Sequence, residues 1–205
     1  MNEQIAAILA NIHAMEEKLE LELEKGRALY GLEVKGKVAA FEQDVVARHR
    51  RFRMGLIQFF RESGLLNILT SPVIYSLLVP LVITDIWVTF YQHICFRAYG
   101  IARVRRGDYI VIDRQHLSYL NAIEAVNCVF CGYANGLIAY VREIASRTEQ
   151  HWCPIKHALR IRDPHERYFK FLEYGDAEGF RARLKEYRKD NQKESPETPP
   201  SPPAA

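Results

Sequence analysis

Residues 65–96 read LLNILTSPVIYSLLVPLVITDIWVTFYQHICF, and this stretch decides how the rest of the chain must be arranged. Asp85 and His93 are the only acidic, basic or histidine residues within it. No soluble helix of ordinary length needs so long an uncharged run, so the stretch is typical of a membrane-inserted segment. As one straight helix it would be about 48 Å long, well beyond the roughly 30 Å of a hydrocarbon core.

Prolines and flanking charges favour a re-entrant hairpin for this segment. Pro72 and Pro80 can each kink a helix, and a split near Pro80 gives halves of about 24 Å, slightly short of a crossing. Arginines lie on both sides of the segment: Arg48, Arg50, Arg51, Arg53 and Arg61 before it, and Arg97, Arg103, Arg105 and Arg106 after it. The positive-inside tendency places both flanks in the cytoplasm. A single tilted crossing, two short crossings and a buried soluble hairpin remain alternatives.

Asp85 would be costly deep in a bilayer. We expect it at the far turn of the hairpin, or as a cap of the second helix after Thr84. A carboxylate that is buried with a partner is the alternative.

The N-terminal region, residues 1–64, has a helical pattern. Apolar residues recur at steps of three or four: Ile5, Leu9, Ile12, Met15 and Leu19. Gly26, Gly31 and Gly36 then weaken the helix, and apolar spacing resumes from Val34 to Leu56. The pattern predicts an antiparallel helix pair or a short coiled coil, and a homodimer or protein partner bound through it. Nucleic acid is a less favoured partner of RHRRFR at 48–53, because a single basic cluster beside an apolar run is weak evidence.

Residues 97–189 are predicted to form a small helical domain. Residues 102–113 alternate around Gly107-Asp108 and predict a short β-hairpin. Asp113 can cap a helix, a second helix is predicted over about 136–150, and a third follows Pro164. Asp176 can cap a last helix that ends near Tyr187, and the proline-rich residues 190–205 are expected to be disordered. The fold class is therefore mainly α, with the β-hairpin as a minor element.

Composition excludes some classes of protein. The net charge is only +3, and four cysteines among 205 residues rule out a disulfide scaffold. The N-terminus lacks a basic start, and Glu16 and Glu17 interrupt its apolar stretch, so no secretory signal is recognised. We expect a reducing, cytosolic setting in which cysteines are thiols or metal ligands.

Two cysteine motifs predict a metal site. Cys128 and Cys131 form a C-x2-C pair, and Cys153 and His157 form a C-x3-H pair. Together they have the ligands of a closed, tetrahedral Cys3His zinc site, with iron as the other metal considered. Such a site requires the helix between the pairs to be short or broken, and Asn135-Gly136 is a credible turn.

Other interpretations of these residues remain open. On a continuous helix, Glu124, Cys128 and Cys131 share one face and could bind an ion in an open, catalytic site. His151, His116 or Glu143 would supply its fourth ligand, and Glu124 or Glu143 would act as the catalytic base. A thiol redox pair is a third interpretation, and ordinary buried small residues are a fourth.

The segment NCVFCGYANGLIAYVREIASRTEQHWCPIKHA at 127–158 resembles a family of uncharacterised bacterial membrane-associated proteins. The resemblance rests on Asn127, Cys128, Cys131, Asn135, Gly136, Tyr140, Arg142, Glu143, Trp152, Cys153, Pro154 and His157. It implies a bacterial source, but no reaction or substrate.

The sequence thus predicts a protein on the cytoplasmic side of a bacterial inner membrane, held to its lipid by residues 65–96. The leading hypothesis for its function is an adaptor with a structural Cys/His metal site. The alternatives are a metalloenzyme that acts on a lipid-linked or amphiphilic substrate, and a metal-free helical interaction protein.

Overall fold

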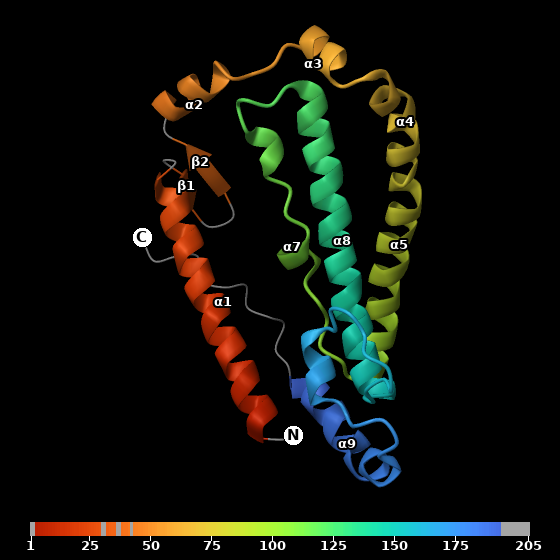
Figure 1. The fold of residues 1–205 in the computed structure, drawn as a ribbon. Helices are drawn as coiled ribbons and strands as arrows, with labels where there is room; N and C mark the ends of the chain where they lie inside the picture. The colour runs from red at the N-terminus through yellow and green to blue at the C-terminus, as the bar shows by residue number, and fades with distance from the viewer. Residues whose placement is uncertain (1–2, 30–31, 36–37, 42, 194–205) are drawn as a thin grey trace.

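The computed structural model describes residues 3–29, 32–35, 38–41 and 43–193, and these residues are mainly helical (Figure 1). The N-terminal part contains α1 (Glu3–Leu29), β1 (Leu32–Lys35), β2 (Val38–Phe41), α2 (Gln43–Arg50) and α3 (Leu56–Glu62). The apolar part contains α4 (Leu65–Ser76), α5 (Leu78–Tyr91), η1 (Gln92–Phe96) and α6 (Arg97–Tyr99). The C-terminal part contains α7 (Arg106–Tyr109), η2 (Arg114–His116), α8 (Ala122–Trp152), η3 (Glu166–Lys170) and α9 (Ala177–Lys193).

The apolar segment is one helix, not a re-entrant hairpin. Helical structure runs from Leu65 to Tyr99, a span of 35 residues that we call the long apolar helix. Leu77 separates α4 from α5 but keeps right-handed helical angles, so the chain does not reverse there. Prolines remove hydrogen bonds without turning the chain, because nearby hydroxyls bond to freed carbonyls. Pro72, for example, leaves the Ile68 carbonyl without its usual N–H donor, and the Ser71 hydroxyl donates to that carbonyl at 2.8 Å.

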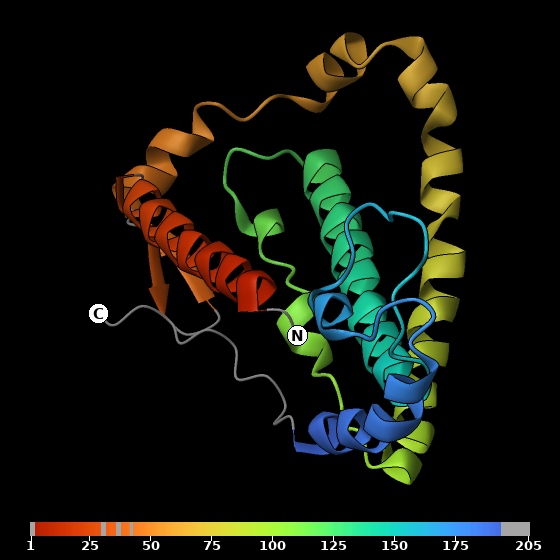
Figure 2. The ribbon, with the colours of Figure 1, turned by 60° about the horizontal axis from the view of Figure 1, so that its bottom comes forward.

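Helix α8 lies beside the long apolar helix and runs in the same direction (Figures 1 and 2). The chain between them returns along the other side of α8 in an extended path. The predicted break at Asn135-Gly136 is absent, since both residues lie inside the 31-residue helix. Gly136 serves a close approach instead: a Cβ there would lie 2.6 Å from the Tyr109 carbonyl oxygen.

The predicted β-hairpin around Gly107-Asp108 is also absent, because α7 occupies that place. The side chain of Gln92 takes the role of a strand partner. Its Oε1 accepts from the Val104 N–H at 3.0 Å, and its Nε2 donates to the Val104 carbonyl at 3.3 Å. With these backbone groups satisfied, the segment has no need of a paired strand.

A hairpin occurs instead where the sequence pattern predicted a returning helix. Strands β1 and β2 pair antiparallel, with Leu32 opposite Phe41 and Lys35 opposite Val38. Valines at 34 and 38 favour a strand over a helix, because a branched Cβ packs well on a pleated surface. In the described residues α1 therefore contacts β1, and no second helix packs on it as a helix pair requires.

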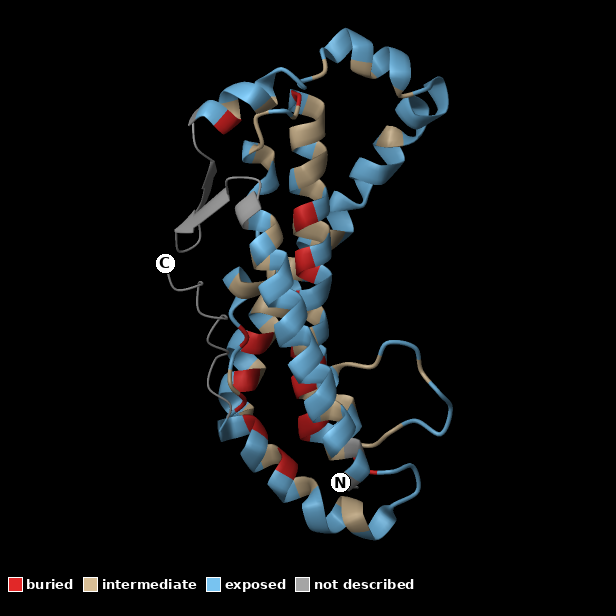
Figure 3. Cartoon of the chain, turned by 60° about the vertical axis from the view of Figure 1, so that its left-hand side comes forward, coloured by how far each residue is buried: buried red, intermediate tan, exposed pale blue. Residues whose placement is uncertain are grey.

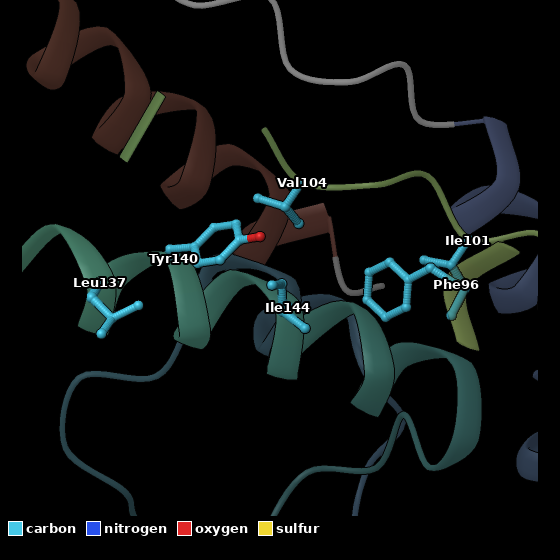
Figure 4. Packing of buried hydrophobic residues seen from close by; sticks show 6 residues of the cluster. All are labelled: Phe96, Ile101, Val104, Leu137, Tyr140 and Ile144. Carbon is cyan, nitrogen blue, oxygen red and sulfur yellow. The ribbon is translucent and has the colours of Figure 1, made fainter. Parts of the chain in front are cut away.

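Buried residues are few, as Figure 3 shows. The main core lies between the lower half of α8, the C-terminal end of the long apolar helix and the segment after it. It consists of Phe96, Ile101, Val104, Leu137, Tyr140 and Ile144 (Figure 4). A smaller cluster of Phe171, Leu172 and Tyr187 joins α9 to the segment around η3.

The last predicted helix is confirmed. The Asp176 carboxylate accepts from the Gly179 N–H at 2.8 Å, which caps α9. Helix α9 continues to Lys193, so the start of the predicted disordered tail at 190 is too early. The remainder of that tail, residues 194–205, lies outside the described residues.

Candidate functional site

The four predicted metal ligands are far apart in this structure. Cys128 and Cys131 lie in the N-terminal half of α8, whereas Cys153 directly follows its last residue. At 1.5 Å per residue, Cys131 and Cys153 are separated by about 33 Å along the helix axis. His157 lies beyond Cys153, and its ring stacks on Tyr168 with centroids 6.1 Å apart. The closed Cys3His zinc site is therefore not formed.

The open site is not assembled either. Within the residues that the structure describes, no three side chains of His, Cys, Asp or Glu are grouped to hold a metal ion. All four cysteines are free thiols. Partial burial and the nearby Glu149 raise the pKa of the Cys153 thiol, which is the opposite of the shift that activates a cysteine.

Glu124, one proposed catalytic base, caps its own helix. Its carboxylate accepts from the Asn121 N–H at 2.8 Å. In return the Asn121 side chain accepts from the N–H groups of Ile123 and Glu124, at 2.9 and 3.0 Å. This reciprocal capping box starts α8 and replaces the start that we predicted at Asp113.

Glu143, the other proposed base, lies between two arginines. Its Oε1 accepts from Arg147 Nε at 2.6 Å and from Arg167 Nη2 at 2.7 Å. Burial alone would raise the pKa of Glu143, but the two guanidinium groups outweigh it and hold the pKa below its ordinary value. A carboxylate held in this way is a structural anion, and a poor proton acceptor near neutral pH.

The long apolar helix exposes one continuous apolar face. This outer stripe consists of Leu65, Leu69, Val73, Ile83, Trp87, Phe90 and Ile94. Each side chain is between 53% and 72% exposed. In α5 and η1 the opposite face packs on α8 and the core through Leu81, Val88 and Phe96, whereas α4 has no buried residue. The outer stripe is about 44 Å long, and the rest of the described residues leave it uncovered.

Asp85 is the one acidic residue of the long apolar helix, and it has a partner. Its carboxylate accepts from Arg106 Nε at 3.0 Å and Arg106 Nη2 at 2.6 Å, in a bidentate pair. The Tyr133 hydroxyl of α8 also donates to Asp85, at 3.0 Å. Asp85 therefore links the long apolar helix to α8 and to the returning segment. The chain has no turn at Asp85, because this residue lies inside α5. Asp85 is instead a carboxylate with partners, which was the alternative interpretation of the sequence.

Segments before and after the long apolar helix contact each other. The Ser118 hydroxyl donates to the Val46 carbonyl at 3.4 Å. The rings of His49 and Tyr119 meet edge-to-face, with centroids 5.6 Å apart. Helix α2 precedes the long apolar helix and residues 118–119 follow it, so this contact brings both flanks to one place.

A basic cavity of about 560 Å³ lies where the long apolar helix ends. Its lining includes His93, Arg97, Gly100, Ala102, Arg103 and Gln192. Gly100 has φ +70°, and the Ile101 N–H donates back to the Phe96 carbonyl at 2.8 Å. This left-handed cap turns the chain sharply, so that Arg103 lines the same cavity as Arg97.

From the sequence, these arginines could hold phosphate or lipid headgroups, or could equally be a plain charge cluster that faces the membrane. The sequence did not predict which of them pair with carboxylates or that α9 contributes Gln192. The signal that could have helped is Tyr99-Gly100-Ile101, a typical helix C-cap with glycine.

In the part of the chain that the structure describes, two helices are long and apolar enough to cross a membrane: Leu65–Tyr99 and Ala122–Trp152. Comparison of the chain with protein-family models, curated proteins and solved structures gave no match.

Proposed function

We propose that this chain is a membrane-attached adaptor whose outer stripe is immersed in one face of a bilayer. The exposed apolar stripe supports attachment, since a contiguous apolar surface of this length is typical of a membrane or protein contact. Helix α8 has the composition of a span, but Glu143, Arg147 and Glu149 lie in its C-terminal half. We therefore assign the lipid contact to the long apolar helix.

The observation that carries this topology is the contact between α2 and residues 118–119. If the long apolar helix crossed the bilayer, residues 100–117 would have to cross back to make that contact. They are not a continuous helix, and they contain Arg103, Arg105, Arg106, Asp108, Asp113 and Arg114. An irregular charged segment is not tolerated in contact with lipid. Both flanks therefore stay on one side, as the arginines on each flank also favour.

We assign this side to the reducing cytoplasm, and the bacterial inner membrane is the membrane proposed. All four cysteines are free, and Cys131 and Cys153 are exposed. Exposed free thiols persist in a reducing compartment.

The adaptor role is assigned to α1. Its apolar residues Ile8, Ile12, Met15 and Leu19 are 45% to 70% exposed, at the spacing of a coiled-coil seam. A second copy of the chain is the first partner to test. The metal hypotheses gain no support from the geometry, so this proposal uses neither zinc nor iron.

Attachment is tested by expressing the chain in a bacterium and washing the membranes with carbonate. We expect the native chain to stay in the membrane fraction. Ile83→Glu with Ile94→Glu, both on the outer stripe, should release it. The matched control is Val126→Glu with Ile138→Glu on α8, because these side chains are 57% and 60% exposed but lie outside the stripe. Complete release of the native chain would refute the proposal.

Topology is tested with single cysteines in a chain whose four native cysteines are serine. Arg53→Cys precedes the long apolar helix, and Arg160→Cys follows it. A thiol reagent that cannot cross membranes should label both sites only after the cells are opened. Labelling of one site in intact cells would instead show that the helix crosses the bilayer.

A further inference from the structure

The basic cavity at the end of the outer stripe contains two arginines whose charge is not balanced. Arg105 lies 3.6 Å from an Asp108 oxygen, and Arg106 pairs with Asp85. Among the described residues, Arg97 and Arg103 have no ion pair. Two arginines of the same cluster are thus neutralised, and the two that line the cavity are not.

We propose that this cavity binds the phosphate of an anionic phospholipid headgroup, an inference that rests on the attachment proposed above. Planar guanidinium groups donate in a fork that matches phosphate oxygens. The cavity volume of about 560 Å³ lies within the usual range for sites that hold a small ligand. His93 and Gln192 add polar groups to the same lining.

A lipid is favoured over a soluble phosphate because of where the cavity lies. Ile94, the last residue of the outer stripe, is one helical turn before Arg97. An acyl chain beside the stripe and a phosphate in the cavity would therefore belong to one molecule at the membrane surface. An adjoining cavity of about 250 Å³ shares His93, Ala102 and Arg103, so there is room for the headgroup beyond the phosphate.

The backbone of the cavity is fixed before any ligand binds. The turn at Gly100 is held by the Ile101-to-Phe96 hydrogen bond, and both of these residues belong to the main core. The Ala102 carbonyl accepts from Arg147 Nη1 at 2.9 Å. A fixed backbone reduces the ordering cost when a ligand binds.

The test measures cosedimentation of the full chain with vesicles of phosphatidylcholine alone and of phosphatidylcholine with phosphatidylglycerol. We expect phosphatidylglycerol to increase partitioning about tenfold or more. Arg97→Gln with Arg103→Gln should abolish most of that increase while leaving binding to neutral vesicles intact. The control is Arg51→Gln with Arg53→Gln, which removes the same charge from the other flank on the same membrane face. Partitioning of this control variant into the phosphatidylglycerol vesicles should fall by about threefold or less.

The outcomes separate this inference from the attachment itself. No binding to either vesicle would refute membrane attachment. Equal binding to both vesicles, or equal losses in the two double variants, would leave attachment intact and refute the phosphate site. Vesicles charged with a fatty acid should not replace phosphatidylglycerol. Displacement by inorganic phosphate at matched ionic strength would assign the cavity to a soluble phosphate and overturn the lipid assignment.

Discussion

The two longest helices of the molecule have similar composition but opposite surroundings. Both Leu65–Tyr99 and Ala122–Trp152 are long and apolar enough for a membrane span. The first has a bare apolar face along its whole length, and polar pairs such as Asp85–Arg106 lie on its packed side. The second contains half of the main core and a fully buried arginine, Arg147. Length and hydropathy alone do not distinguish a lipid contact from a structural core.

The largest effect is expected at Arg147, which is 1% exposed on α8. Arg147→Met leaves Glu143 without one of its arginines and the Ala102 carbonyl without its donor. Breaking a buried pair costs about 3–5 kcal/mol. Denaturant unfolding in mild detergent would measure this loss. Arg183→Met removes an exposed pair and should change stability by less than about 1 kcal/mol. Equal losses would mean that α8 is not the core helix.

A smaller loss is expected at Gly136, where α8 meets the returning segment. The Cβ of Gly136→Ala would lie 2.6 Å from the Tyr109 carbonyl oxygen and 2.8 Å from Ile110 Cα. Both are backbone atoms, so the segments must move apart, at a cost of about 1–3 kcal/mol. The added Cβ of Gly26→Ala in α1 would have no atom within 4 Å, so this substitution should stabilise its helix by up to about 1 kcal/mol. Thermal unfolding of both variants checks the contrast.

Part of the loss of stability in acid should come from Glu143 of α8, which pairs with Arg147 and Arg167. Because the pKa of Glu143 is lowered in the folded chain, its stabilisation is present at neutral pH. It is lost as the pH falls below about 4.5 toward the folded pKa, since the unfolded carboxyl then binds a proton. Glu143→Gln should be less stable at pH 7 and should lack this part of the acid sensitivity. Glu166→Gln, at an exposed position, should keep the native profile in urea titrations.

The smallest effect is expected where the N-terminal halves of the two helices touch. The Tyr75 hydroxyl donates to Asn127 Oδ1, and the Tyr75 ring lies 6.0 Å from that of Phe130. Tyr75→Phe keeps the ring contact and removes the hydrogen bond, at a cost of about 0.5–1.5 kcal/mol. A double-mutant cycle with Asn127→Ala isolates the coupling free energy between Tyr75 and Asn127. A coupling near zero would show that α4 is not held against α8.

Local signals in the sequence predicted several elements because the determining contacts are local. The apolar periodicity from Ile5 predicted α1, and the Asp176 cap predicted α9. The uncharged run predicted a membrane-inserted hairpin at residues 65–96, and the structure has a single helix there that is long and apolar enough to cross a membrane. The long-range contacts were not predictable. Asn135-Gly136 has the chemistry of a turn, but the missing Cβ of Gly136 serves a contact with residues 26 and 27 positions earlier in the chain.

The candidate site illustrates the same limit. Cysteine spacing is compatible with a metal site only if the chain folds back, and a continuous α8 removes that condition. Glu124 and Glu143 are chemically suited to catalysis, but Glu124 caps its own helix and Glu143 pairs with two arginines. The pairing of Asp85 with Arg106 spans 21 residues and requires the returning segment, which sequence periodicity does not reveal.

The contact between Val46 and Ser118 has a consequence for biosynthesis. Under the attachment proposed above, both described flanks of the apolar helix lie on one side of the membrane, so neither flank has to be translocated. On that proposal, the helix could associate with the membrane surface after its synthesis. Delivery then requires neither a pore nor an energy-driven export step, only protection of the bare stripe from other hydrophobic surfaces until it reaches lipid.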